Sequence, residues 1–259
     1  MVVAVLALLV AILVPSLNLA KQRARAVICR TNLAGLVRAN QLYAQAFDGY
    51  YVPAAADIFV SSGGNRHRWH GVRPRPGEPF DSAAGPMAKY LGDSGRIRQC
   101  PSFTDFHTAA GAVGYEAGSG GYGYSETYIG SRFWQDGYYC DSPGQKLGAR
   151  VEEVRRASDT VMFADAAMPM GLGGGAWYVE ESFAYCTFRL KADGTVSTSR
   201  NQPSIHFRHG GAANVAWCDG HVTARDDMHS ISRNVYQADP GAMNVGWFGP
   251  DDNSLFDLK

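Results

Sequence analysis

The sequence has no surplus of charge of either sign, because 24 lysine and arginine residues balance 24 aspartates and glutamates among 259 residues. A neutral chain lacks the basic surface that attracts nucleic acid, so we expect no nucleic-acid partner. Glycine and proline, with 30 and 12 residues, fall short of the content typical of disordered low-complexity chains. The 13 tyrosines, 12 phenylalanines and 5 tryptophans supply enough apolar area for a sizeable core.

The motifs that mark common enzyme classes are also missing. No G-x-S-x-G elbow, P-loop or H-E-x-x-H zinc motif occurs. The glycines of 118–123 spell G-x-G-x-x-G, but no helix is predicted to follow them, as dinucleotide binding requires. Ser158, His209 and Asp165 are a trio that any chain of this size contains. We therefore expect no catalytic residues and no enzymatic activity.

The first twenty residues contain no charged side chain. This run just reaches the roughly 20 residues that a helix needs to cross a bilayer, provided that Ser16 and Asn18 are tolerated near one end. Pro15 predicts a kink or local melting. A cleaved secretory signal is disfavoured because the positive charges follow the run instead of preceding it. These charges are Lys21, Arg23, Arg25 and Arg30.

The helical pattern continues beyond the apolar run. One stripe at helical spacing is formed by Cys29, Leu33, Leu36, Tyr43 and Phe47. The Asp-Gly pair at 48–49 supplies the stop. We predict one helix over residues 1–50, apolar all round in 1–20 and amphipathic afterwards. No linker rich in proline, glycine and serine separates the two parts.

Several motifs together carry a family resemblance. The apolar run with its proline is followed by AKQRARAVICRTNLAGLVRANQLYAQAFDGYYVP, and His209 is followed after nine residues by Asp219-Gly220. Other matches are Cys100-Pro101-Ser102, GYGYSETYIG, ASDTVMFADA and GWFGPDDNSLFD. In this order they resemble the type IV pilin-like proteins and pseudopilins, in the branch with a C-terminal H-X9-DG signature, the prepilin-type processing-associated domain.

The resemblance implies a structural subunit of a type IV pilus-like or type II secretion-like filament. Its partners would be copies of itself, the inner membrane before assembly, and the pilus or secretion machinery. Its location would be the inner membrane, in a single pass, and a cell-surface or periplasmic filament. The family's basic leader, glycine cleavage site and following glutamate do not occur here. If Pro15 aligns with the family's helix proline, Met1 is a misassigned start or a truncation, and processing and methylation follow from the resemblance alone.

Residues 51–259 predict a β-rich head, so the fold class is α+β and pilin-like. A compact apolar run at 159–164, bounded by charges, indicates a buried strand. The runs 214–218 and 221–223, joined by Asp219-Gly220, predict a hairpin with a type I′ turn. We expect the back half of the long helix to pack on one face of an antiparallel sheet.

Four residues near the hairpin are of the types that bind metals: His206, His209, Asp219 and His221. Their spacing matches no closed ligand pattern, so we favour a structural interpretation. His209 would then pack beneath the hairpin and cap a backbone group, while Asp219 holds the turn. Asp165, which ends the buried strand, could meet this hairpin in space.

A second cluster lies near the C-terminus and consists of Asp251, Asp252, Asn253 and Asp257. Hard oxygen ligands at this density suit calcium. Some pseudopilins similar to this chain bind calcium in a C-terminal loop. The competing interpretation is that Asp and Asn form ordinary turns, since the spacing is not that of an EF-hand. Calcium is the one candidate cofactor.

The five cysteines are an odd number. If the head is exported, a disulfide can form. We favour Cys29 with Cys100, because Cys29 lies on the sheet-facing helix stripe and Cys100 begins a rigid Cys-Pro turn. Cys218, inside a hairpin strand, is expected to be a small buried core residue.

A rival function is a monomeric, membrane-anchored extracytoplasmic module that binds carbohydrate. Its stacking platform would come from aromatic side chains in the head. These are Trp69, Trp134, Tyr138, Tyr139 and Trp177. An anchored module tolerates a flexible linker after its anchor, and the absence of such a linker favours the filament subunit.

Overall fold

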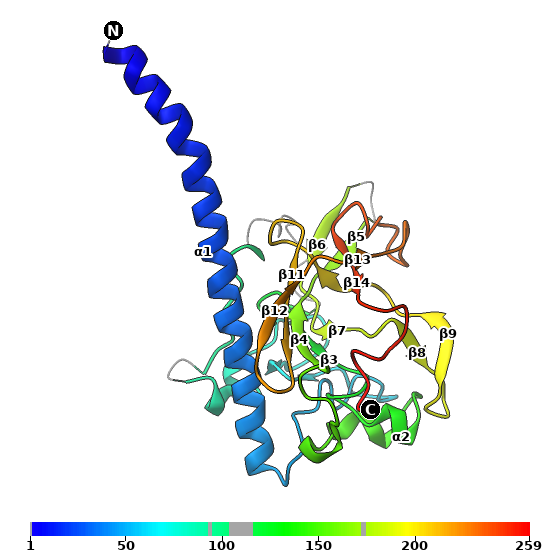
Figure 1. Cartoon of the computed structure of the whole chain (residues 1–259). Helices are drawn as coiled ribbons and strands as arrows, with labels where there is room; N and C mark the ends of the chain where they lie inside the picture. Colours follow the sequence, from blue (N-terminus) through cyan, green and yellow to red (C-terminus); the bar gives the residue numbers. More distant parts are fainter. Residues whose placement is uncertain (1, 93–94, 104–115, 172–174) are drawn as a thin grey trace.

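The computed structural model describes residues 2–92, 95–103, 116–171 and 175–259. One long helix, α1 (Val2–Ala46), runs along one side of a head built from short strands. Its front half projects well beyond the head, and its back half lies against it (Figure 1). The mixed α+β class predicted from the sequence is confirmed.

Helix α1 is continuous over 45 residues and passes through Pro15. The local melting predicted at this proline does not occur. The helix ends where Asp48 and Gly49 adopt left-handed backbone conformations, with φ of 49° and 81°. The Gly49 amide donates to the Ala44 carbonyl at 2.9 Å, which satisfies one of the last carbonyls of the helix. The predicted stop at Asp48-Gly49 is confirmed.

The prediction of a single-pass inner-membrane protein was wrong. Among the described residues, no helix is at once long enough and apolar enough to cross a bilayer. The prediction depended on counting all of residues 1–20 as apolar. Ser16 and Asn18 are polar and lie in this run, so it has fewer apolar residues than the roughly 20 that a helix needs to cross a bilayer.

The main sheet has the strand order β12-β11-β4-β3-β7. Its strands are β3 (Tyr122–Ser125), β4 (Val161–Asp165), β7 (Phe183–Ala184), β11 (Ala213–Trp217) and β12 (Val222–Arg225). Neighbouring strands are antiparallel except at one edge, where β3 and β7 run parallel. The prediction of an antiparallel sheet therefore fails at β7. At Gly123 a Cβ atom would lie 2.5 Å from the Phe183 backbone carbon, so this strand pair needs glycine there.

The other sheets are small. One has the order β10-β14-β13 and the rest are two-stranded: β1-β2, β5-β6 and β8-β9. Their bounds are β1 (His67–Arg68), β2 (Gly71–Val72), β5 (Met168–Met170), β6 (Trp177–Val179), β8 (Phe188–Leu190), β9 (Val196–Arg200), β10 (Ile205–His206), β13 (Met228–His229) and β14 (Val245–Phe248). The short helical elements are α2 (Phe133–Asp136) and the 3-10 turns η1 (Ser82–Ala84), η2 (Ala88–Tyr90), η5 (Pro143–Lys146) and η6 (Val151–Glu153).

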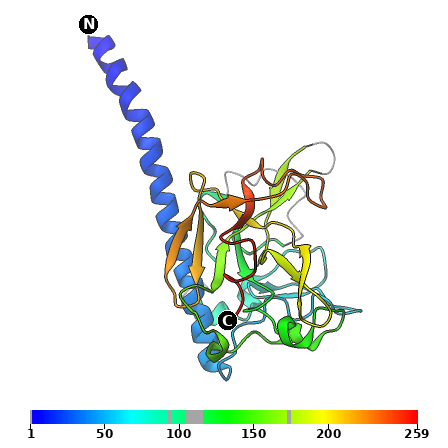
Figure 2. The same ribbon diagram turned by 45° about the vertical axis from the view of Figure 1, so that its right-hand side comes forward.

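The back half of α1 packs against β11, β4 and β12, and both views show the β11–β12 hairpin beside it (Figure 2). Cys29, Leu33 and Leu36 of the predicted stripe are buried and belong to the same core cluster as the strands of the main sheet. Tyr43 is half-buried, but Phe47 is 44% exposed. Phe47 follows the last residue of α1, where the chain turns, so it leaves the buried stripe.

The predicted hairpin is present as β11 and β12, with Ala216 opposite Val222. Its turn differs from the predicted type I′, which needs a positive φ at both central residues. Gly220 has a φ of 100°, whereas Asp219 is outside the left-handed region. The Gly220 amide donates to the Trp217 carbonyl at 2.9 Å. Glycine is required at this position by its φ.

Candidate functional site

Four residues of metal-binding type meet where α1 joins the head: Cys29, Cys100, Asp165 and His209. We call them the junction cluster. Their ligand atoms all lie within 4.8 Å of one another. Cys29 comes from α1, Asp165 from the end of β4, and His209 from the segment between β10 and β11. The cluster therefore joins parts of the chain that are far apart in sequence.

The Asp165 carboxylate is fully buried and lies at the centre of these contacts. Its Oδ1 accepts from the Cys29 thiol at 3.0 Å and from Arg208 Nη2 at 2.7 Å. Its Oδ2 accepts from the Asn214 backbone amide at 2.7 Å and lies 3.3 Å from His209 Nε2. Burial raises the pKa of Asp165, but Arg208 and His209 outweigh it and hold this pKa below its usual range.

Arg208 is the buried cation that compensates Asp165. Its guanidinium also donates to the carbonyls of Ala166, at 3.1 Å, and Gly121. It lies 5.1 Å from the centre of the Phe103 ring. Burial lowers the pKa of Arg208, but the charge of Asp165 dominates and raises it. Both members of the pair therefore carry a charge, and Arg208 donates its hydrogen bonds through Nη1 and Nη2.

The two thiols of the cluster differ in acidity. The neighbouring Cys29 thiol, together with Arg208 and His209, lowers the pKa of Cys100 to about 4 against the effect of burial. Burial raises the pKa of Cys29, whose thiol therefore keeps its proton. Burial lowers the pKa of His209, but its contacts with Asp165 and Cys100 prevail and raise it to about 9. These two directions favour a thiolate at Cys100 beside a protonated His209.

This arrangement differs from a catalytic triad. In a triad the acid and the nucleophile contact different nitrogens of the histidine. Here Asp165 and Cys100 both approach Nε2 of His209, at 3.3 and 3.6 Å. Cys100 is also fully buried, so no substrate reaches its sulfur. The residue types, two thiols with an imidazole and a carboxylate, suit a thiophilic metal ion instead.

The structure places the predicted site residues unevenly. His209 lies in the junction cluster and contacts Asp165, and among the described residues its ring forms no hydrogen bond with the backbone cap that was predicted. Cys29 and Cys100 are brought together as predicted, but both are free thiols and no disulfide joins them. Arg208 was missed, because a buried arginine has no signal in the sequence that separates it from an exposed one.

The rest of the H-X9-DG signature lies at the opposite end of β11 from His209. Asp219 Oδ1 accepts from the His221 backbone amide at 3.0 Å, so this side chain holds the turn as predicted. His221 Nδ1 lies 2.6 Å from the same oxygen. Cys218 is buried, as predicted. His209 therefore lies apart from Asp219 and His221, although from the sequence they were considered as ligands of one metal site.

The four residues predicted to hold calcium each have other partners. Asp251 pairs with Arg200 at 2.6 Å. Asp252 accepts from the Ser254 amide, and Asp257 from the Lys259 amide. Asn253 is buried, and its Nδ2 donates to the Phe188 carbonyl at 2.9 Å. The geometry gives no support for calcium, and the contacts match the alternative of ordinary turns and caps.

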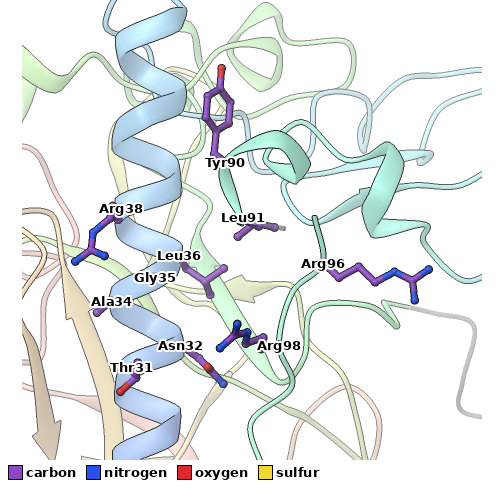
Figure 3. A pocket seen from close by; sticks show the side chains of 11 residues that line it. Thr31, Asn32, Ala34, Gly35, Leu36, Arg38, Tyr90, Leu91, Arg96 and Arg98 are labelled. Carbon is purple, nitrogen blue, oxygen red and sulfur yellow. The ribbon is translucent and has the colours of Figure 1, made fainter. Parts of the chain in front are cut away.

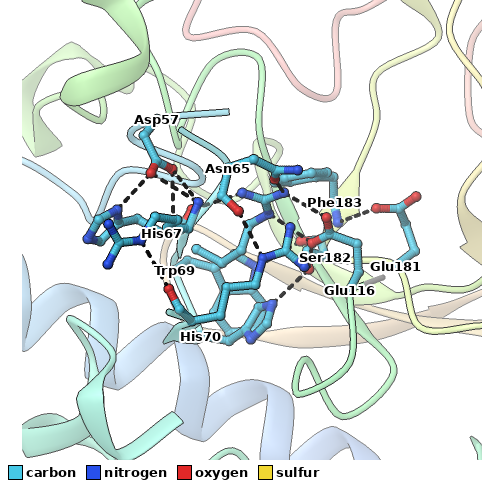
Figure 4. Close-up of polar contacts among 12 residues, drawn as sticks. Asp57, Asn65, His67, Trp69, His70, Glu116, Glu181, Ser182 and Phe183 are labelled. Carbon is cyan, nitrogen blue, oxygen red and sulfur yellow. Dashed lines mark hydrogen bonds and ion pairs between the residues drawn. The ribbon is translucent and has the colours of Figure 1, made fainter. Parts of the chain in front are cut away.

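A second buried polar network lies in the head (Figure 4). Arg68 forms two hydrogen bonds with Glu116, at 2.7 and 2.8 Å. The Ser182 hydroxyl donates to Glu116 at 2.6 Å and lies 2.7 Å from His70 Nε2. All four side chains are buried. We therefore regard this network as a support for the fold, since it satisfies buried charges and presents no accessible reactive group.

Glu126 lies buried in the same part of the head. The Thr127 hydroxyl donates to its carboxylate at 3.2 Å. Burial dominates over this hydrogen bond and over the charge of Arg68, and raises the pKa of Glu126 to about 7. The folded chain therefore binds a proton at this residue more tightly than the unfolded chain does.

A cavity of about 350 Å³ lies between α1 and the segment near Arg98 (Figure 3). Three arginines line it, namely Arg38, Arg96 and Arg98. Figure 3 shows Arg38 on the opposite side of α1 from the other two. Because the guanidinium groups do not converge, the cavity offers no defined anion site.

No family model matches this sequence, and neither the curated proteins nor the solved structures contain a match. The resemblance to pilin-like proteins thus depends on the sequence motifs alone.

We predict that Arg208→Leu destabilises the fold by about 3–5 kcal/mol, because it leaves the Asp165 carboxylate buried without its cation. Arg225→Leu is the matched control, since Arg225 pairs with Asp227 at the surface. It should cost at most about 1 kcal/mol. Denaturant unfolding of both variants measures the difference, and equal costs would contradict the role given to Arg208.

We predict that Glu126→Gln stabilises the chain at alkaline pH. In the wild type, the contribution of Glu126 to stability falls as the pH rises from about 4.5 to about 7, because the unfolded state loses its proton first. Glutamine does not titrate. The free energy of unfolding of the variant should therefore exceed that of the wild type by an amount that grows from about zero to at most about 3 kcal/mol over this window. Unfolding at pH 4.5 and pH 8 measures it. The exposed Glu152→Gln is the control, and an advantage that does not change with pH would disprove the assignment.

Proposed function

We propose that this chain is a structural subunit that assembles with copies of itself through the front half of α1, residues 2–20. The proposal is supported chiefly by the apolar side chains that this segment exposes. They are between 49% and 79% exposed. They are Val3, Leu9, Val10, Ile12, Leu13, Val14, Leu17 and Leu19.

These side chains surround the helix. Ile12, Leu13 and Val14 follow one another in sequence, and successive residues of a helix point about 100° apart. One flat partner would therefore cover only part of the segment. Helices that are apolar all round are found buried among other apolar elements. Several neighbours must surround each front half, as in a bundle or a helical filament.

The front half also determines which neighbours are suitable. It has no charged side chain, so a neighbour gains most by presenting an apolar surface of its own. The front half of another copy is such a surface. Because the chain has no net charge, heads brought close together do not repel one another strongly.

The back half of α1 makes the geometry of assembly reproducible. It is packed into the core of the head, and α1 is helical throughout, so the front half is held at a fixed angle to the head. Packed front halves would form the centre of the assembly, with heads around it. The sequence resemblance to pilin-like proteins agrees with a pilus-like or secretion-like filament of this design. We propose no catalytic step for this subunit.

The rival carbohydrate-binding function has less support. Its platform was to come from aromatic side chains, but Trp69 is fully buried. Tyr138 packs against Phe59 and Phe133, with ring centres 5.0 and 4.7 Å apart. Of the five aromatics, Tyr139 is the one that is exposed by more than a third. The burial of Trp69 and the packing of Tyr138 therefore give this rival less support than the exposed apolar helix gives to assembly.

We predict that Leu13→Glu prevents assembly of the full-length chain. A carboxylate placed among packed apolar helices is costly, and a loss of about 3 kcal/mol weakens association by roughly 100-fold. Sedimentation velocity should show large assemblies for the wild type and monomers for the variant, both with the same circular dichroism spectrum.

Val196→Glu is the matched control, because Val196 is 51% exposed but lies on β9 of the head. This variant should assemble like the wild type. Two results would contradict the proposal: a wild type that stays monomeric at all concentrations, or a Leu13→Glu variant that assembles as well as the control.

A further inference from the structure

We propose that the junction cluster is a structural zinc site, with Cys29, Cys100, Asp165 and His209 as its four ligands. The two sulfurs, the carboxylate and the imidazole nitrogen converge on one point from four separate segments. Two thiolates with an imidazole favour zinc over hard ions such as calcium and magnesium. This site is independent of the proposed assembly, which depends on residues 2–20.

The spacing of the ligand atoms fits a tetrahedral ion. Zinc bonds of about 2.0 to 2.3 Å place neighbouring ligand atoms about 3.3 to 3.8 Å apart. His209 Nε2 lies 3.3 Å from Asp165 Oδ2 and 3.6 Å from the Cys100 sulfur. The Cys29 sulfur lies within 4.8 Å of the other ligand atoms. Small side-chain adjustments would thus complete the coordination.

The charges around the cluster also balance. Binding of zinc would release the protons of Cys29 and His209, since zinc takes thiolate and neutral imidazole ligands. Two thiolates and one carboxylate then carry three negative charges, and the zinc ion supplies two positive ones. Arg208, which is buried and bonded to Asp165 at 2.7 Å, supplies the third. The Asn214 amide, at 2.7 Å from Oδ2, helps to fix the orientation of the carboxylate. In protein metal sites, ligands are commonly held in place by hydrogen bonds from groups that do not bind the metal themselves.

The burial of the ligands indicates a structural role. Cys29, Cys100 and Asp165 are fully buried, and the His209 side chain is 4% exposed. A site closed by four protein ligands leaves no position for a substrate or a water molecule. The ion would tie α1 to the head, because Cys29 belongs to α1 and the other three ligands to the head.

A disulfide between Cys29 and Cys100 is the rival arrangement. It would use the two sulfurs alone and would give no reason for an imidazole and a carboxylate to meet at the same point. The Cys29 thiol instead donates to Asp165 at 3.0 Å, and the Cys100 sulfur lies beside His209. These contacts favour a shared ion over a bond between the sulfurs.

The test is the zinc content of the full-length chain, purified under reducing conditions without chelator and measured by elemental mass spectrometry. We expect about one zinc per chain in the wild type and less than about a tenth in Cys29→Ser and Cys100→Ser, since each loses a ligand. Cys140→Ser and Cys218→Ser are the controls, one exposed and one buried, and should keep the metal.

Cobalt(II) provides a test that does not depend on the stability of the variants. Added to metal-free wild type, it should give the strong visible bands of a tetrahedral ion and a thiolate charge-transfer band in the near ultraviolet. Three results would overturn the proposal: wild type without zinc and without these bands, cysteine variants that retain zinc, or peptide mapping of chain isolated without reductant that finds Cys29 and Cys100 joined by a disulfide.

Discussion

The buried carboxylate of Asp165 is the constraint on which the arrangement of this molecule depends. A charge away from water is tolerated only when it is paired and hydrogen-bonded. Asp165 obtains its partners from α1, through Cys29, and from the segment before β11, through Arg208, His209 and Asn214. Satisfying this one group therefore fixes the helix and the hairpin against β4. A zinc ion at the same place would strengthen the constraint without changing which segments it joins.

This constraint divides α1 into two parts with different roles. The back half is buried with the main sheet, and the junction at Cys29 lies near the start of the buried part. Of the side chains described before that point most are exposed, and from Leu9 to Leu19 the large apolar ones are at least 49% exposed. Because one end of the helix is packed into the head and the other end exposes apolar side chains, the helix holds an apolar surface in a fixed orientation to the head. Self-assembly follows from this division if copies are the available apolar partner.

Local signals in the sequence predicted the elements that depend on neighbouring residues. The helix end at Asp48-Gly49, the buried strand β4 and the β11–β12 hairpin all follow from patterns within a few residues. The parallel pairing of β3 with β7 and the burial of Arg208 depend on residues far apart in sequence, so no local pattern indicates them. Asp165 is an intermediate case, because the sequence predicted its position at the end of a buried strand but not the residues that it contacts. The membrane prediction failed because residues 1–20 reach the length needed to cross a bilayer only if the polar residues in this run are counted as apolar.

The central claim is that the back half of α1 is part of the head while the front half is not. Amide hydrogen exchange of the dissociated Leu13→Glu chain tests it most directly. The account predicts that residues 29–44 exchange as slowly as β4 and β11, through a shared global opening, and that residues 2–20 exchange much faster. If residues 29–44 exchanged as fast as the front half, the helix would not be anchored by the junction, and the account would be wrong.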